Sequence, residues 1–557
     1  MKNKKYIYVL LIIISGVILF YPALNNDFVN WDDDVYILNN PDITSFSNID
    51  KFFTNYYIGH YHPLTMISYA IDYAVSGYDP FIYHIHNVLL HIISSILIFY
   101  IVLLLLKNNV SAFITALLFL IHPLRVESVA WIAERKDVLY TVFYFASVLL
   151  YVLSKQSNEK PQKKRLLFLA IIFFILSLLS KTAAVSLPLV LIMIDIYLGV
   201  KIKKAIITKI PLLLFSAIVG FFTLYVLGHE KAIYDISNNY TLLDRIFMTF
   251  YALSFYIVRL FYPFNLSASY FFVEKTNGFL PVTYYLSVVL IFAIILFVIK
   301  SKILKKELVF GFLVYLFTIF MFLQIIPSGR VLVADRYSYV PYFGLFFIIA
   351  AVYKYLESKK QYLRLYTILL SLIILISLYS TNKRIKVWKN GVSLFTDIIE
   401  DYPNNPLGYV NRGLAYYYGF SENHKIDYYK SIEDFNKAIS IDHNNIKAVF
   451  NRGNSYYMIG DLNNALNDFN KTIELDSTYA KAYNNRGLVY SRLVNDKMAL
   501  EDFNKAILLV PDYSEAYYNR GITYYNTGNL VKACEDWNKA KSLKYLEAEN
   551  FILKYCN

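Results

Sequence analysis

The hydrophobic and polar positions divide the chain into two parts. Up to about residue 380, long apolar runs alternate with short polar stretches, and many runs reach the length that a helix needs to cross a bilayer. After Pro406 the chain becomes polar, and its apolar positions recur at helical spacing. The pattern predicts an all-α protein in which a polytopic membrane domain precedes a soluble helical domain.

Eleven apolar segments are predicted to span the membrane. They cover residues 6–22, 86–106, 110–122, 138–154, 166–180, 182–199, 210–227, 284–300, 308–326, 338–356 and 362–380. A further run, 246–262, carries Arg259 and follows Arg245, which leaves open whether it crosses. The first segment has a basic start and no small-residue cleavage site after it, so we expect a retained signal anchor.

Basic clusters between the runs indicate the orientation, because Lys and Arg concentrate on the cytoplasmic side of a membrane. The clusters lie at Lys2–Lys5, 155–165, 201–209, 300–306 and 354–364. All of these clusters fall on one face of the membrane only if the run 246–262 does not fully cross it. We therefore expect 228–283 to be one long external segment with a re-entrant or interfacial piece. This topology puts the C-terminal domain on the same external side as the loop after the first span.

Two short signatures repeat in the C-terminal part. Asn-Arg-Gly begins at residues 411, 451, 485 and 519, the last three at a step of 34 residues. Asp-Phe/Trp-Asn-Lys begins at residues 434, 468, 502 and 536 and keeps the 34-residue step throughout. A 34-residue period with Gly, Tyr, Ala and a second aromatic is the tetratricopeptide (TPR) pattern. It predicts repeats over 406–445, 446–479, 480–513 and 514–547 with a C-terminal cap, the first repeat carrying about six extra residues around 421–426.

Stacked TPR repeats form a concave surface that usually binds peptides or proteins. The Asn-Arg pairs on the first helix of each repeat are candidates for this groove. The predicted groove residues are Asn451, Arg452, Asn485, Arg486, Asn519 and Arg520. The alternative interpretation is that these consensus residues only pack the solenoid.

Composition supports a membrane protein and argues against a nucleic-acid partner. The chain of 557 residues is 57% hydrophobic and 17% charged, with a mean hydropathy of +0.41. The net charge of +13 comes with lysine clusters between apolar runs, as membrane anchoring requires. The two cysteines, Cys534 and Cys556, do not decide the redox compartment.

Three consecutive acids, Asp32, Asp33 and Asp34, stand about ten residues beyond the first apolar run. Carboxylates beside a bilayer are costly unless they face water, a cation or a reacting group. The cluster is therefore a candidate functional site in the first external loop. A solvated acidic loop that caps a helix is the structural alternative.

Other polar motifs gather on the same predicted face, whereas the loops on the opposite face are merely rich in lysine. The external motifs are Asn40-Pro41-Asp42, Tyr61-His62-Pro63-Leu64-Thr65, His122-Pro123-Leu124-Arg125-Val126-Glu127, Glu134-Arg135-Lys136-Asp137, Leu179-Ser180-Lys181-Thr182 and Ala334-Asp335-Arg336-Tyr337. This polarisation predicts a functional cavity at the outer leaflet.

These motifs resemble those of the transmembrane-and-TPR O-mannosyltransferase family, which belongs to the GT-C glycosyltransferase superfamily. The resemblance adds Tyr262-Pro263, Leu266-Ser267 and the segment from Trp388 to Phe395, and it follows nearly the whole chain in order. In the Tyr61-x-Pro63 motif the family has an arginine where this chain has His62, and Asp34 is an extra acid. The lysine-, asparagine- and isoleucine-rich composition is typical of a bacterial or archaeal relative.

The resemblance implies a GT-C-like glycosyltransferase domain over 1–382, a connecting helix over 383–405 and a TPR domain over 406–557. It also implies transfer of a sugar, with mannose favoured, from a polyprenyl phosphate to Ser/Thr hydroxyls of protein acceptors. The active site and the TPR domain would lie outside the cytoplasmic membrane. The donor lipid and an acceptor or partner protein are the expected partners, and no cofactor is indicated.

The chemistry of this transfer assigns roles to the charged residues. A partly desolvated carboxylate can have a raised pKa and accept the hydroxyl proton, so Asp33 or Asp32 is the predicted base, with a slight preference for Asp33. Cations stabilise a phosphate leaving group, and Arg336, Arg135 and Lys181 are predicted to bind it. The further site candidates are Asp34, His62, His122, Glu127, Asp137 and Asp335.

Structural alternatives accompany these assignments. In one alternative, Glu127 and Arg135 form a structural ion pair between loop helices. In another, Arg336 only anchors the chain at the membrane interface. A metal site is suggested by histidines 60, 62, 84, 86, 91 and 122. It is less favoured, because side chains two residues apart on a helix, such as His84 and His86, diverge.

Two rival functions stay open at the sequence level. One keeps the lipid-linked donor but transfers the sugar to a lipid or a cell-envelope glycan. The other is a non-catalytic membrane scaffold whose TPR repeats bind partners. An anchor needs few spans and no buried charges, so eleven spans with acids and arginines on one face argue against the scaffold.

Overall fold

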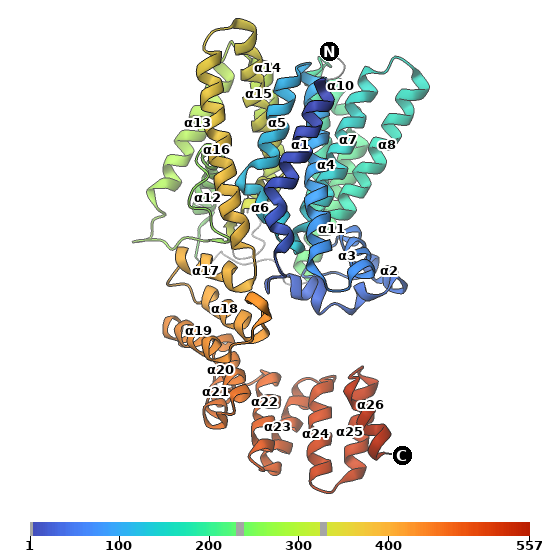
Figure 1. The fold of residues 1–557 in the computed structure, drawn as a ribbon, viewed down its shortest axis with the longest axis vertical. Coiled ribbons are helices and arrows are strands. Elements are labelled where there is room, and N and C mark those ends of the chain that lie inside the picture. Colours follow the sequence, from blue (N-terminus) through green and yellow to red (C-terminus); the bar gives the residue numbers. More distant parts are fainter. Residues whose placement is uncertain (1–3, 230–238, 324–330, 557) are drawn as a thin grey trace. The chain divides into compact units, whose positions relative to one another are not determined.

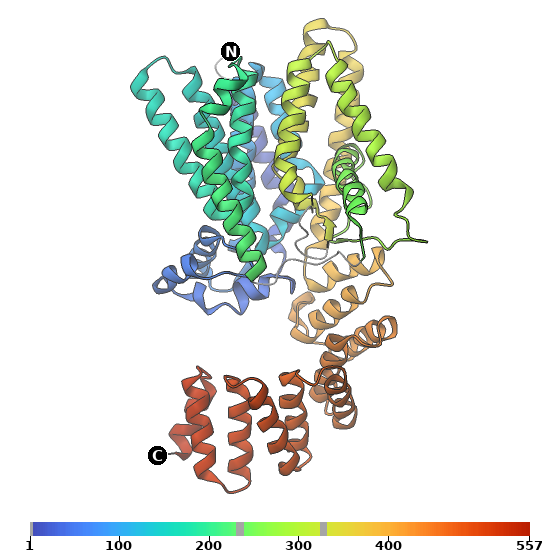
Figure 2. The same cartoon turned by 180° about the vertical axis from the view of Figure 1, so that it is seen from behind.

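The computed structural model describes residues 4–229, 239–323 and 331–556, and these residues are almost entirely helical (Figures 1 and 2). The all-α fold class is therefore confirmed. Internal contacts divide the chain into two units, Met1–Asn390 and Gly391–Asn557. Lys2, part of the first predicted basic cluster, lies outside the described residues.

The first unit contains sixteen α-helices and one two-stranded sheet among its described residues. The helices are α1 (Lys4–Phe20), α2 (Ile49–Thr54), α3 (Pro63–Ser76), α4 (Pro80–Leu106), α5 (Asn109–Ile121), α6 (Val126–Ala130), α7 (Arg135–Gln156), α8 (Lys160–Ser180), α9 (Leu187–Tyr197), α10 (Ile202–Ile207), α11 (Ile210–His229), α12 (Leu242–Phe261), α13 (Val282–Lys300), α14 (Lys305–Ile319), α15 (Tyr342–Lys359) and α16 (Leu363–Val387). Strands β1 (Tyr270–Phe271) and β2 (Val331–Val333) pair antiparallel.

The long apolar helices make this chain an integral membrane protein. Each of the eleven predicted segments overlaps one helix, namely α1, α4, α5, α7, α8, α9, α11, α13, α14, α15 or α16. Within the described residues, six helices are long and apolar enough to cross a bilayer, or seven if the bent pair Asn109–Ile121 and Pro123–Ala130 counts as one span. The figure of eleven spans stays a prediction. Figure 1 shows α1, α4, α5 and α7 side by side, with α2 and α3 at one end of them.

The ambiguous run 246–262 forms most of α12, a continuous helix of 20 residues. Its start is fixed by a capping box in which the Thr241 side chain accepts from the Asp244 amide and the Asp244 carboxylate accepts from the Thr241 amide. α12 is not among the six helices above. Part of the predicted external segment, residues 230–238, lies outside the described residues.

The second unit has the TPR architecture expected from the sequence. Its helices are α17 (Gly391–Asp401), α18 (Pro406–Tyr418), α19 (Tyr428–Ile441), α20 (Ile446–Ile459), α21 (Leu462–Leu475), α22 (Ala480–Arg492), α23 (Asp496–Leu509), α24 (Ser514–Asn526), α25 (Leu530–Ser542) and α26 (Glu547–Tyr555). The four predicted repeats correspond to the pairs α18/α19, α20/α21, α22/α23 and α24/α25. The inserted residues of the first repeat include a 3-10 turn at Glu422–His424.

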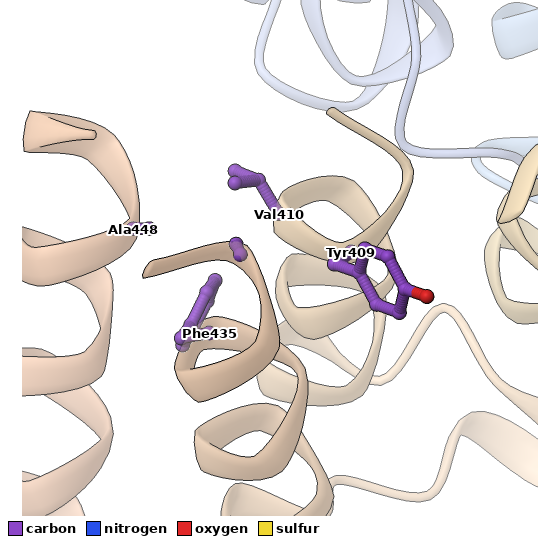
Figure 3. Close-up of a cluster of buried hydrophobic side chains, with 5 residues drawn as sticks. Tyr409, Val410, Phe435 and Ala448 are labelled. Carbon is purple, nitrogen blue, oxygen red and sulfur yellow. The ribbon is translucent and has the colours of Figure 1, made fainter. Parts of the chain in front are cut away.

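The glycine of each Asn-Arg-Gly signature explains why the Asp-Phe/Trp-Asn-Lys signature accompanies it. A Cβ atom on Gly453 would lie 2.9 Å from the Phe469 ring, and one on Gly487 would lie 2.8 Å from the Phe503 ring. The aromatic ring therefore fills the space beside the glycine of its own repeat. Figure 3 shows the equivalent ring, Phe435, in the core of the first repeat near Val410.

A disulfide between Cys534 and Cys556 joins α25 to the C-terminal cap helix α26. The two Cα atoms are 5.7 Å apart, and the bond closes a sequence separation of 22 residues. Trp537 packs on Phe551 of the cap with ring centroids 5.0 Å apart. The disulfide therefore reinforces a hydrophobic contact that already holds the cap against the last repeat.

We expect Cys556→Ser to loosen α26, because the open chain gains conformational freedom when the cap is unpaired. The free energy required to open the cap should fall by about 2–4 kcal/mol. Hydrogen–deuterium exchange of residues 547–555 measures it, and Cys534→Ser is the matched control that must give the same acceleration. Exchange that is unchanged in both variants would show that packing alone holds the cap.

Candidate functional site

Glu127 on α6 fixes Arg336 by two contacts. The Arg336 guanidinium pairs with Glu127 Oε1, and the Arg336 backbone N–H donates to Glu127 Oε2 at 2.8 Å. The guanidinium also lies over the ring of Trp131, 5.7 Å from its centroid. The predicted bridge between Glu127 and Arg135 does not form, because Glu127 bonds to Arg336 instead.

Two lysines join Arg336 around the carboxylate of Glu134. Lys136 Nζ lies 3.1 Å and Arg336 Nε 3.3 Å from Glu134 Oε1, while Lys181 Nζ lies 3.6 Å from Glu134 Oε2. Lys181 also pairs with Asp137. The structure thus brings together the predicted residues Arg336, Lys181, Glu127 and Asp137. We call Arg336, Lys136 and Lys181 the cation cluster.

Asp33 connects the loop after α1 to the start of α7. Its side chain is buried, and its two carboxylate oxygens accept the Val29 N–H at 2.9 Å and the Ala133 N–H at 2.8 Å. Burial raises the pKa of Asp33 to about 8, although both backbone donors act in the opposite direction. Its contacts make Asp33 a residue that positions the loop.

Asp32 is half-buried, and the positive charges of Lys136 and Arg336 in the cation cluster act on its carboxyl group. Burial raises the pKa of Asp32 above the ordinary value, and the charges that act on it include Lys136, Glu134 and Arg336. In the described part of the chain, its carboxylate accepts no hydrogen bond. Asp34 instead accepts from the Val35 N–H at 3.0 Å, at the start of a short helical segment that has no side-chain cap.

His62 lies next to this loop as a buried, neutral side chain. Burial lowers its pKa well below the ordinary value, and the positive charge of Lys136 acts in the same direction. Its ring packs on Tyr36 with centroids 5.2 Å apart. The ring of Tyr36 lies in turn beneath Lys136 Nζ, at 5.1 Å. His62 therefore helps to position the aromatic floor of the cation cluster.

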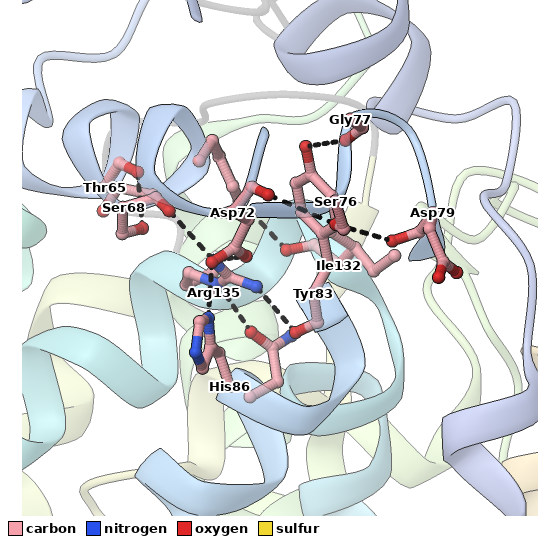
Figure 4. Close-up of polar contacts among 12 residues, drawn as sticks. Thr65, Ser68, Asp72, Ser76, Gly77, Asp79, Tyr83, His86, Ile132 and Arg135 are labelled. Carbon is pink, nitrogen blue, oxygen red and sulfur yellow. Dashed lines mark hydrogen bonds and ion pairs between the residues drawn. The ribbon is translucent and has the colours of Figure 1, made fainter. Parts of the chain in front are cut away.

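The guanidinium of Arg135 lies beside Asp72 and Tyr83 (Figure 4). The group pairs with Asp72 and donates to Asn87 Oδ1 at 2.8 Å and to the Tyr83 carbonyl at 2.6 Å. His86 also pairs with Asp72. These contacts join α3, α4 and α7. The structure gives Arg135 a structural role in place of the predicted phosphate contact.

His122 and Asp335 are buried, and neither bonds to a residue of the cation cluster in the described structure. His122 Nε2 lies 3.3 Å from the Leu260 carbonyl, and its ring packs edge-on against Tyr342. Asp335 accepts from the Tyr270 hydroxyl at 2.9 Å. Burial raises the pKa of Asp335 to about 7, with Arg384 acting against this shift. Both residues support the segment that carries Arg336.

Three residues of this region, Arg125, Glu134 and Lys136, were not among the predicted site residues. Arg125 is fully buried, donates to the Tyr339 carbonyl at 2.6 Å and thereby holds the segment after Arg336. All three belong to motifs that already contained candidate residues. Their position beside those candidates was the signal in the sequence that could have found them. No group of three or more His, Cys, Asp or Glu side chains arranged for a metal occurs in the described ranges.

In the TPR unit, the predicted groove arginines Arg452, Arg486 and Arg520, together with Arg412, act as clamps between helices. Each forms two parallel hydrogen bonds with an aspartate, at 2.7–2.9 Å, in the second helix of its own repeat. The pairs are Arg412–Asp434, Arg452–Asp468, Arg486–Asp502 and Arg520–Asp536. Arg452, Arg486 and Arg520 also donate to an asparagine of the preceding repeat, at 2.6–2.7 Å. The packing interpretation therefore holds for these arginines.

The asparagines connect the first helices of neighbouring repeats. Asn485 Nδ2 donates to Asn454 Oδ1 at 2.8 Å, and Asn519 Nδ2 donates to Asn484 Oδ1 at 3.1 Å. Asn451 accepts a weak bond from Asn454 at 3.4 Å. Asn519 is largely buried, whereas Asn451 and Asn485 are half-buried. Asn451 and Asn485 consequently remain candidates for the groove.

Comparisons with known proteins agree with this architecture. The family model described as "TPR repeat" matches residues 453–494, and two described as "Tetratricopeptide repeat" match 480–513 and 503–535. Protein O-mannosyl-transferase F38B6.6 of Caenorhabditis elegans is 25% identical over 427 residues, 72% of this chain and 59% of the relative. Human protein O-mannosyl-transferase TMTC1 is 33% identical over 142 residues, 23% of this chain and 16% of the relative.

The chain is similar to curated protein O-mannosyl-transferases, and it carries TPR repeats. The resemblance inferred from the motifs is therefore confirmed. The chain spans less than two thirds of the length of these curated relatives. Among solved structures, the crystal structure of MamA is 24% identical and covers 28% of this chain and 90% of its own, with a TM-score of 0.25.

We expect Arg486→Ala to destabilise the repeat stack, because Asp502 is left buried without its cation. The free energy of unfolding of the repeat stack should fall by about 2–4 kcal/mol. Hydrogen–deuterium exchange of α22 and α23 in the full-length chain measures it. Arg492→Ala is the control, since Arg492 contacts only the ring and carbonyl of Tyr457 in the described structure. Unchanged exchange together with weaker binding of an acceptor would restore the groove role of Arg486.

Proposed function

We propose that this chain transfers a sugar, with mannose favoured, from a polyprenyl phosphate to Ser/Thr hydroxyls of protein acceptors. The single observation that supports the proposal best is the cation cluster with Asp32 beside it. Cations suit a departing phosphate, and a carboxylate suits an attacking hydroxyl. The named relatives are protein O-mannosyl-transferases, which favours mannose and a protein acceptor over a glycan or lipid.

In the proposed reaction, the acceptor hydroxyl oxygen bonds to the anomeric carbon of the sugar while the bond from that carbon to the phosphate oxygen breaks. Asp32 accepts the hydroxyl proton. The released polyprenyl phosphate carries the bonding electron pair, and Arg336 and Lys181 stabilise its charge. Glu127 and Asp137 act as positioning residues, because they hold these two cations.

Geometry favours Asp32 over Asp33 as the base. Both oxygens of Asp33 already accept backbone hydrogen bonds, whereas Asp32 lies among charged side chains without a bond to its carboxylate in the described structure. A proton acceptor needs a lone pair that reaches the substrate. Asp33 is then required for the position of Asp32.

We further propose that the reaction and the TPR domain are on the external side of the membrane, where the domain binds the acceptor. The disulfide between Cys534 and Cys556 supports this side, because disulfides persist in oxidising compartments. The distribution of basic clusters favours the same orientation.

Asp32→Asn should reduce sugar transfer by at least about 100-fold without changing thermal stability, because it removes the base but no structural contact. Asp33→Asn should lower both transfer and the melting temperature, because an amide cannot accept both backbone N–H groups. The free energy of unfolding should fall by about 1–3 kcal/mol. Transfer from a synthetic polyprenyl phosphate mannose to a Ser/Thr peptide measures activity. A stable, inactive Asp33→Asn with an active Asp32→Asn would reverse the assignment, and full activity in both variants would refute it.

Deletion of residues 406–557 should lower transfer to protein acceptors and spare transfer to short peptides, because the repeats bind acceptors outside the catalytic unit. Competition between a folded acceptor and a short peptide for the same enzyme measures the ratio. An unchanged ratio in the truncated enzyme would contradict the recruitment role. Loss of both activities would indicate that the repeats stabilise the catalytic unit.

A further inference from the structure

Glu134 lies where the three side chains of the cation cluster meet. Its Oε1 atom is 3.1 Å from Lys136 Nζ and 3.3 Å from Arg336 Nε, and its Oε2 atom is 3.6 Å from Lys181 Nζ. Glu134 is only 2% exposed. The carboxylate of Glu134 therefore contacts all three cations of the cluster.

Arg336 and Lys181 are held in place without Glu134. Glu127 binds Arg336 through both the guanidinium and the backbone N–H. Lys181 is held by Asp137, whose other oxygen accepts from the Ser128 hydroxyl at 3.2 Å. Removal of the charge on Glu134 would thus leave both cations where they are.

Lys136 has aromatic support in place of a second carboxylate. Its ammonium lies 5.1 Å from the Tyr36 ring centroid and 6.0 Å from that of Trp131. A lysine over aromatic rings keeps an attraction for its charge while leaving N–H donors available for an anion. Glu134 is the carboxylate that Lys136 pairs with in the described structure.

Glu134 itself is weakly held apart from these cations. Its Oε2 atom is buried without a hydrogen bond from the described residues. A buried carboxylate in such surroundings is stabilised chiefly by opposite charges. A stronger anion at the same place would compete for the same three cations.

We propose that Glu134 occupies the position of the donor's phosphate group and that Lys136 is its third cationic ligand. This inference rests on the proposed function. On binding, the phosphate oxygens take over the contacts to Arg336, Lys136 and Lys181, and the Glu134 carboxylate moves aside. No covalent bond changes in this exchange. The ligand chemistry is a phosphate anion, and the lipid chain of the donor adds binding energy that free phosphate lacks.

The test is binding of farnesyl phosphate and, separately, of inorganic phosphate to the full chain in nanodiscs. We expect Glu134→Gln to bind farnesyl phosphate about tenfold more tightly than the unsubstituted chain, because the uncharged amide no longer competes for the cations. Glu127→Gln is the matched control, and it should bind more weakly because Arg336 loses its anchor. Inorganic phosphate should show the same order of affinities at lower strength if the headgroup alone is recognised.

Each outcome decides between the two proposals. Equal or weaker binding by Glu134→Gln, with normal binding by the unsubstituted chain, would overturn the inference and leave the proposed function standing. No binding of farnesyl phosphate by the unsubstituted chain would instead contradict the proposed function. If Glu134→Gln does not fold, Lys136→Gln replaces it: about tenfold weaker binding supports the third ligand, and unchanged binding overturns it.

Discussion

The region of the candidate site depends on the carboxylate of Asp33. It accepts one backbone N–H from its own loop and one from Ala133, just before α7. These two bonds fix the long loop after α1 against the segment that begins α7. The neighbours of the two bonded segments, Asp32 on one side and Glu134 and Lys136 on the other, are brought together as a result.

A second constraint acts on the segment that carries Arg336. Arg336 belongs to a segment that Glu127 holds through the guanidinium and the backbone, and Arg125 holds the residues that follow through the Tyr339 carbonyl. Charges at the ends of apolar helices need such partners, because an unpaired charge there is costly. The pairing that makes these charges tolerable also arranges them around one point.

The TPR unit uses a related pairing for a different purpose. Its arginines bond to aspartates within a repeat and to asparagines of the preceding repeat, so each clamp stabilises both the helix pair and the stacking. The glycine beside each arginine makes room for the ring beside each aspartate. The two repeated signatures are therefore the two halves of one contact.

Periodicity alone determined much of this protein. Apolar runs of bilayer length predicted eleven helical segments, and the 34-residue period predicted the TPR repeats, because both depend on local spacing along the chain. Sequence motifs also led to Arg336, Lys181, Glu127 and Asp137 as parts of one site. Only the tertiary structure decided the partners of these charges: Arg135 turns to Asp72, Lys136 joins Arg336, and Cys534 meets Cys556. A partner distant in sequence is chosen by packing and desolvation, which a linear pattern does not contain.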